Sequence, residues 1–132
     1  MPWEWLIDMI QEWHFSHVFV DRGDPAAADF LKGDLTLDGA WHDLDLSGIV
    51  PSNAKAVALY VALFATDVNQ NIWFRTNGNV NTYNVSHAFT QTSLIWSTGD
   101  FIVPLDEARK IEYMSVYPTW MLISITVKGW WF

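Results

Sequence analysis

The residues able to do acid–base or nucleophilic chemistry in this chain are few. Its four histidines are His14, His17, His42 and His87. His14 and His17 have a spacing that suits two ligands on one helix face, but their segment alternates like a strand, which would turn them to opposite faces. His42 and Asp43 could join a serine in a catalytic triad, yet no Gly-x-Ser-x-Gly motif is present. We therefore expect a non-enzymatic protein, with a hydrolase that uses His42 as a distant alternative.

Acidic residues raise the question of metal binding. Aspartates crowd one third of the chain, at Asp29, Asp34, Asp38, Asp43 and Asp45. Loop carboxylates bind calcium, but the spacing is not that of an EF-hand, and exposed turns favour Asp for other reasons. The absence of cysteine excludes thiolate metal sites and disulfides. We expect no metal and no cofactor.

Sugar recognition is the binding chemistry for which the sequence offers most. Sugar rings stack on exposed aromatic side chains, while amide and guanidinium groups hydrogen-bond to hydroxyls. The candidate glycan-binding residues are Trp73, Arg75, Asn77, Asn79 and Tyr83. The Asn-Gly pair at 77–78 predicts a tight turn between strands at 71–76 and 81–87. Asn is also common in turns and Trp in cores, so a carbohydrate- or receptor-binding module that recognises a cell-surface glycan is the alternative function.

The elements that must position these residues are predominantly β. The chain has 132 residues, enough for one domain with a sizeable core, and is 51% hydrophobic and 16% aromatic. Short alternating runs are separated by turn residues every eight to twelve positions, as in sandwiches and jelly rolls. We predict an all-β domain over residues 15–132, an antiparallel β-sandwich or jelly roll of about eight strands.

The central strand is predicted at residues 55–65, which read KAVALYVALFA. Branched aliphatics occupy one side, and the other side, which includes Tyr60 and Phe64, is also apolar. A strand that is apolar on both faces must be covered on both. One cover is the partner sheet, and we expect the other to be a second subunit or the N-terminal segment.

Residues 1–14 are predicted to form a separate Trp-rich unit, with an amphipathic helix at 2–13. Pro2 suits a first helical turn, and acidic side chains line one stripe of the helix. A helix this short must dock to persist, either on its own domain or on a neighbouring copy. Insertion into a membrane surface is disfavoured because the polar stripe is acidic.

The net charge of the chain restricts the classes of partner that it can bind. The formal charge is −8, with 15 acidic and seven basic residues, so nucleic acid would be repelled. No apolar run is long enough to span a membrane, and the first residues lack the basic start of a signal peptide. The segment at 22–25, Arg-Gly-Asp-Pro, contains the tripeptide that integrins bind, but its composition indicates a turn.

Four stretches carry a resemblance: RGDPAA at 22–27, WHDLDLS at 41–47, FRTNGN at 74–79 and ITVKGWW at 125–131. Together they resemble a group of small uncharacterised domains from bacteriophage and metagenomic sequences, identified as virion components. The likeness covers residues 22–132 and includes no catalytic motif. It implies a β-sandwich structural module of a capsid decoration or tail protein, commonly trimeric, located in the virion and in contact with other virion proteins.

These observations lead to one expectation of function. The chain is expected to be a non-enzymatic virion protein that self-associates as a homo-oligomer, most simply a trimer. The predicted interface residues are Trp3, Trp5, Ile10, Trp13, Tyr60, Phe64, Trp130 and Phe132.

Overall fold

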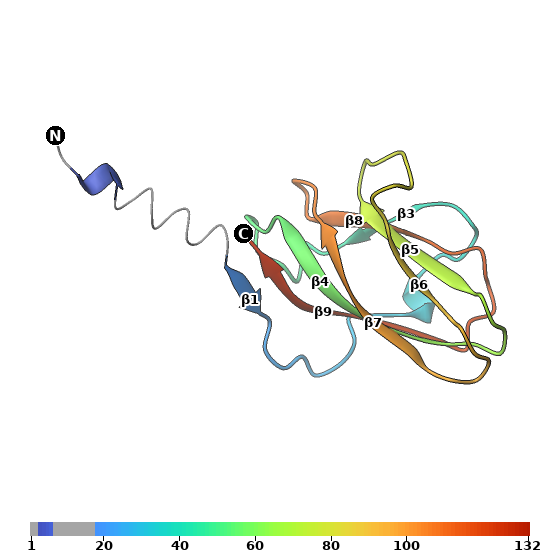
Figure 1. Cartoon of the computed structure of the whole chain (residues 1–132). Helices are drawn as coiled ribbons and strands as arrows, with labels where there is room; N and C mark the ends of the chain where they lie inside the picture. The colour runs from blue at the N-terminus through green and yellow to red at the C-terminus, as the bar shows by residue number, and fades with distance from the viewer. Residues whose placement is uncertain (1–2, 7–17) are drawn as a thin grey trace.

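Alternation of apolar and polar residues produces two antiparallel sheets that pack face to face (Figure 1). The computed structural model describes residues 3–6 and 18–132. Sheet A contains β1 (Phe19–Asp21), β2 (Phe30–Leu31), β4 (Ala56–Phe64), β7 (Ser97–Pro104) and β9 (Leu122–Trp131). Sheet B contains β3 (His42–Asp45), β5 (Asn71–Thr76), β6 (Ser86–Phe89) and β8 (Lys110–Met114). A short 3-10 helix at Lys32–Asp34 follows β2.

The strand pairing is that of a jelly roll. The first strands, β1 and β2, both pair with the last strand, β9. Moving inward along the chain, β3 pairs with β8, β4 with β7, and β5 with β6. This nested antiparallel pairing, joined by the β4–β9 and β5–β8 ladders, wraps one long hairpin into two sheets. The predicted all-β sandwich or jelly roll is confirmed.

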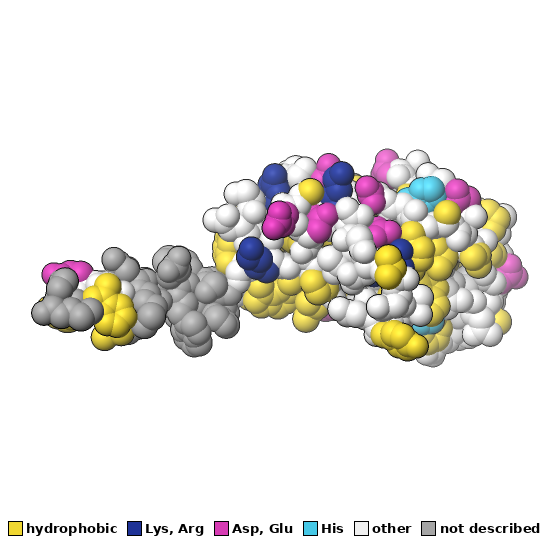
Figure 2. All heavy atoms as spheres, turned by 90° about the horizontal axis from the view of Figure 1, so that it is seen from above, with side chains coloured by type: hydrophobic (Ala, Val, Ile, Leu, Met, Phe, Trp, Pro, Cys, Tyr) yellow, Lys and Arg dark blue, Asp and Glu magenta, His cyan; other side chains and the backbone are white. Residues whose placement is uncertain are grey.

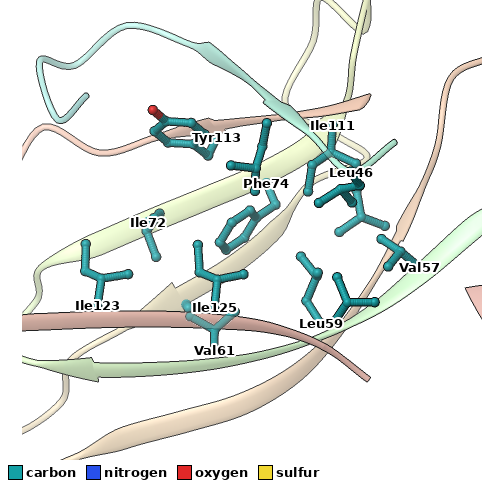
Figure 3. Close-up of a cluster of buried hydrophobic side chains, with 14 of the residues drawn as sticks. Leu46, Val57, Leu59, Val61, Ile72, Phe74, Ile111, Tyr113, Ile123 and Ile125 are labelled. Carbon is teal, nitrogen blue, oxygen red and sulfur yellow. The ribbon is translucent and has the colours of Figure 1, made fainter. Parts of the chain in front are cut away.

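The core lies between the sheets, where aliphatic side chains meet. Val57, Leu59, Val61 and Leu63 form the inward row of β4 and are at most 1% exposed. They face side chains of sheet B, among them Phe74, and Figure 3 shows the two sets pointing toward one another. Burying each such side chain contributes roughly 1.5–3 kcal/mol. The predicted central strand is therefore the main contributor of sheet A to the core.

One buried polar group in the core is fully paired. The indole of Trp120 is 0% exposed, and its Nε1 donates to the hydroxyl of Ser115 at 3.1 Å. That hydroxyl in turn donates to the carbonyl of Asn71 at 2.7 Å. The chain satisfies the polar atom of its largest buried side chain, as burial requires.

A β-bulge interrupts β9, and the loop between β1 and β2 stabilises it. The register between β4 and β9 shifts so that Ala58 pairs with Gly129 and Leu59 with Val127. Asp29 accepts a hydrogen bond from the backbone N–H of Val127 at 2.8 Å, and Arg22 donates to the carbonyl of Val127 at 3.2 Å. Arg22 and Asp29 also form a two-pronged ion pair. The guanidinium of the Arg-Gly-Asp tripeptide is thus committed to the fold.

Three predicted segments differ from the structure. The second strand of the predicted 71–87 hairpin is β6 at Ser86–Phe89, because pairing Ala88 with Ile72 places an apolar side chain inward, whereas 81–84 are polar and exposed. Strand β7 begins at Ser97, although the sequence at 93–99 predicts a loop. Of the predicted helix, residues 3–6 form one turn with Trp3, Trp5 and Leu6 exposed, and 7–13 lie outside the described residues, as do 14–17 of the predicted first strand.

Candidate functional site

The outward surface of sheet B carries a network of charged and aromatic side chains. The register aligns Asp43, Glu112 and Arg75 across three strands. Arg75 donates to Glu112 at 3.3 Å, and Glu112 also accepts from the backbone N–H of Gly78 at 2.8 Å. The ring of Trp41 lies over the Arg75 guanidinium at 3.9 Å, a cation–π contact. Arg75 is only 8% exposed, so this network stabilises the fold and leaves little of the cation for a ligand.

A stack of rings continues this surface toward the edge strand β6. The imidazole of His87 lies parallel to the indole of Trp73, with ring centres 4.0 Å apart, and Phe89 leans on His87 at 5.0 Å. The side-chain oxygen of Asn71 accepts a hydrogen bond from Nε2 of His87. Partial burial lowers the pKa of His87 below the ordinary value for histidine, so the ring is neutral at pH 7.

The predicted glycan-binding residues do not form one site with side chains available to a ligand. Trp73 is partly buried under His87, and Arg75 is paired with Glu112. The amide of Asn77 donates to Asp106 at 2.9 Å, and the backbone N–H of Asn79 closes a turn onto the carbonyl of residue 76. Tyr83 lies in the 77–85 loop and is 96% exposed. The polar groups at 75 and 77 hold the loop in place, and the aromatic side chain at 83 stands free.

A cleft of about 430 Å³ opens between the edge strands β6 and β7, where the two sheets separate. Its floor is apolar and includes Val61, Leu63 and Phe101, and its rim includes Phe89 and Trp96. Sequence analysis missed this cleft. The available signal was a row of small residues on β7, where Ser97 and Gly99 occupy inward positions that bulky side chains fill on β4.

The outward surface of sheet A, here called the A face, is apolar and flat. Its members, read from the register, are Ala56, Ala58, Tyr60, Ala62 and Phe64 on β4, Thr98, Asp100, Ile102 and Pro104 on β7, Leu122, Ser124, Thr126, Gly129 and Trp131 on β9, Leu31 on β2, and Phe19 and Asp21 on β1. Tyr60 is 38% exposed and Ile102 62%. Charge on this surface is sparse: Asp100 forms an ion pair with Lys128 at 2.9 Å, and Asp21 is an exposed carboxylate on the edge strand β1.

The predicted interface residues are distributed unevenly over the structure. Tyr60 and Phe64 lie on the A face, and Trp3 and Trp5 are exposed on the short helical turn. Trp130 instead points inward and packs against the core, while Trp131 lies on the A face with its ring 4.7 Å from that of Phe19. Phe132 is partly buried. Ile10 and Trp13 lie outside the described residues.

Among the residues considered for catalysis and metal binding, His42 and the nearby aspartates have structural partners, and His14 and His17 lie outside the described residues. Nε2 of His42 bonds to Asp38 at 2.8 Å, which lowers the pKa of that carboxyl, and the N–H of Ala40 adds to the effect. Asp43 instead lies 4.0 Å from Lys110. The N–H of Ser47 lowers the pKa of Asp45.

Searches of the described residues and of known proteins gave negative results. Within 3–6 and 18–132, no group of three or more His, Cys, Asp or Glu residues is arranged to hold a metal ion. In the same ranges no helix has the length and apolarity to cross a membrane. No protein-family model matches the chain, and no curated protein matches it significantly.

Proposed function

We propose that this jelly roll is a non-enzymatic structural module that assembles with copies of itself through the A face. The resemblance to phage domains leads us to expect a trimer as the oligomeric state. It also leads us to expect that the protein is a capsid decoration or tail protein in contact with other virion components. The observation that carries the proposal is the largely apolar outward surface of sheet A, whose central strand β4 carries no charge.

The two outward surfaces of the sandwich differ in the way that this proposal requires. An antiparallel sheet with one face in water normally alternates apolar-inward and polar-outward residues. Sheet B follows the rule, since its outward positions include Asp43, Asp45, Arg75, Lys110 and Glu112. Sheet A departs from it, since its long central strand β4 carries no charged residue on either side. Figure 2 shows one face of the molecule, on which acidic and basic side chains lie close together over part of the surface.

A second copy of the chain suits the A face better than a charged or strongly polar partner. Small side chains at Ala56, Ala58 and Ala62 make the centre flat, as close sheet-to-sheet packing needs. Tyr60 and Ile102 supply the larger apolar contacts of an interface core. The ion pair between Asp100 and Lys128 brings both charges to one place, so two copies can meet there without an unmatched charge.

Exposed aromatic side chains on the A face and near the N-terminus add to the apolar area available for contact. Phe19 and Trp131 pack together where the first strand of sheet A begins, and Phe19 is 41% exposed. The chain therefore enters the sandwich beside the A face. Trp3 and Trp5 are 69% and 49% exposed, a large unburied apolar area for residues so close in sequence. A neighbouring copy offers both groups a place to be buried.

A charge placed on the A face tests the proposal. Tyr60→Asp adds a carboxylate directly across from Asp100, and we expect self-association to weaken by about 30-fold or more, the effect of losing one strong interface contact. Val80→Asp is the matched control, because Val80 is 90% exposed on the loop beside sheet B and the charge change is the same.

Light scattering on a size-exclusion column, run at several concentrations, measures the mass of each variant. The expected result is dissociation for Tyr60→Asp and an unchanged oligomer for Val80→Asp. An oligomer unaffected by Tyr60→Asp, with the fold intact by circular dichroism, would refute the assigned surface.

A further inference from the structure

We propose that the cleft between β6 and β7 is a binding site for a neutral sugar ring, such as the terminal residue of a glycan. The inference rests on the shape of the cleft, its lack of charge, its two exposed aromatic walls and the free strand edge beside it. It does not require self-association through the A face, although the two surfaces adjoin at Phe64 and Thr98.

The cleft exists because β7 carries small residues where a sandwich normally carries large ones. Ser97 pairs with Leu63 and Gly99 with Val61, so the small residues lie beside the apolar row of β4 on the inward side of sheet A. The ring of Phe101 lies against Gly99, where an added Cβ would come within 3.0 Å of it. The resulting volume of about 430 Å³ falls in the lower part of the range of about 300–1,000 Å³ for small-molecule sites.

The lining restricts the ligand to an uncharged one. Among the described residues that line the cleft, none is Asp, Glu, Lys or Arg. His87, at the rim, is hydrogen-bonded to Asn71 and stacked on Trp73. An anionic or cationic ligand would lose its hydration without gaining a counter-charge, which opposes its binding.

Two aromatic side chains at the rim of the cleft are partly exposed to solvent. Trp96 is 52% exposed and is supported on one side by Phe64, with ring centres 5.2 Å apart. Phe89 is 38% exposed and is supported by His87. Because each ring is already packed against a neighbour, a ligand that stacks on it does not have to order it first. Flat aromatic surfaces with such support suit the apolar face of a pyranose ring.

Hydrogen-bonding groups at the free edge of β7 make a purely apolar ligand unsuitable. The carbonyls of Ile102 and Pro104 point away from β4, since they accept from Ser86 at 3.3 Å and Thr76 at 2.8 Å. By strand alternation, the backbone groups of Thr98 and Asp100 point to the same side, at the open end. An acyl chain would leave them unpaired, whereas sugar hydroxyls can donate to them and accept from them.

The same edge is too short to favour an added peptide strand. Contacts from Ser86 and Thr76 close the end of β7 near Pro104, and that proline has no N–H to offer a partner strand. Only the stretch near residues 97–100 stays open. A compact ring with several hydroxyls uses this stretch better than an extended backbone, which needs a longer ladder.

Nuclear magnetic resonance titration of the full chain tests the site. The probes are maltotetraose, cellotetraose, chitotetraose and lacto-N-neotetraose, with 3′-sialyllactose as the charged comparison and an uncharged six-residue Thr-Val peptide as the strand comparison. We expect at least one neutral saccharide to shift the amides of residues 97–99 and the indole of Trp96.

Trp96→Ala should weaken that binding by about tenfold, the effect of losing one aromatic stack, and Trp96→Phe should restore most of it. Ile95→Ala is the matched control, because Ile95 is 57% exposed beside Trp96 but does not line the cleft. The site is refuted if no neutral saccharide binds at about 10 mM, a concentration that would reveal even a weak site. It is also refuted if shifts map elsewhere, if only the charged sugar or the peptide binds, or if Trp96→Ala and Ile95→Ala behave alike.

Discussion

Replacing Asp29 with Ala removes the carboxylate that joins the β1–β2 loop to the bulge of β9. One side-chain oxygen accepts from the N–H of Val127 at 2.8 Å, and the carboxylate also pairs with both terminal nitrogens of Arg22. The side chain of Asp29 is 9% exposed and that of Arg22 is 22% exposed. The variant therefore leaves a partly buried cation and a backbone donor without their partner.

The size of the effect follows from these contacts. Breaking a buried ion pair by removing one member costs about 3–5 kcal/mol. Because the guanidinium of Arg22 retains some access to water, we expect the lower end, about 3 kcal/mol. An unfolding entropy of roughly 2.1 cal/mol/K per residue, applied to 132 residues, converts this to a decrease in Tm of about 11 °C.

Urea denaturation and differential scanning calorimetry measure the loss. The matched control is Asp43→Ala, which removes an aspartate that is 55% exposed and 4.0 Å from Lys110, and which should cost less than about 1 kcal/mol. A double replacement, Arg22→Met with Asp29→Leu, should cost less than the sum of the two single changes. Equal losses for Asp29→Ala and Asp43→Ala would refute the role of Asp29 at the bulge.

Three further variants test other parts of the structure. Gly129→Ala should lower the free energy of unfolding by about 2–3 kcal/mol in urea denaturation, because its Cβ would collide with the backbone carbonyl of Val20 and the ring of Phe19. Unchanged stability would contradict that packing. The lowered pKa of His87 predicts that its contribution to the free energy of unfolding is complete above pH ~6.5 and decreases as the pH falls through the folded-state pKa, because the unfolded chain binds the proton first. His87→Gln should lack this pH-dependent contribution. Identical curves of stability against pH for the two proteins would contradict the prediction. Glu112→Ala should lower the free energy of unfolding by about 3 kcal/mol, because it leaves the buried guanidinium of Arg75 without its ion-pair partner. A decrease of less than about 1 kcal/mol would contradict a stabilising role for this pair.

Local patterns were sufficient to predict several strands. The runs at 42–45, 110–114 and 122–131 alternate apolar with polar residues, 56–64 is apolar on both sides, and 71–76 precedes an Asn-Gly turn. Segments placed by tertiary contacts were not predictable in the same way. The polar run at 81–84 resembles a strand in composition, but only the pairing of Ala88 with Ile72 decides where β6 lies.

The site was harder to predict because single insertions change which way side chains point. Regular alternation from Ile123 to Val127 would turn Trp130 outward, and the bulge at Lys128 reverses this, so that Trp131 is the outward residue. The cleft depends on two edge strands that are far apart in sequence, and only their separation in space exposes it. Arg75 and Asn77 are close in the chain, but their partners, Glu112 and Asp106, come from distant segments that the sequence does not point to.

Self-association through the A face is tested most directly by the mass of the unmodified chain in solution. Sedimentation velocity over about a hundredfold range of concentration, wide enough to reveal dissociation by mass action, gives this mass. An assembled species with a mass that is a multiple of 15.2 kDa, expected to be near 46 kDa for three chains, would support the account. A single species of 15.2 kDa at every concentration would contradict it.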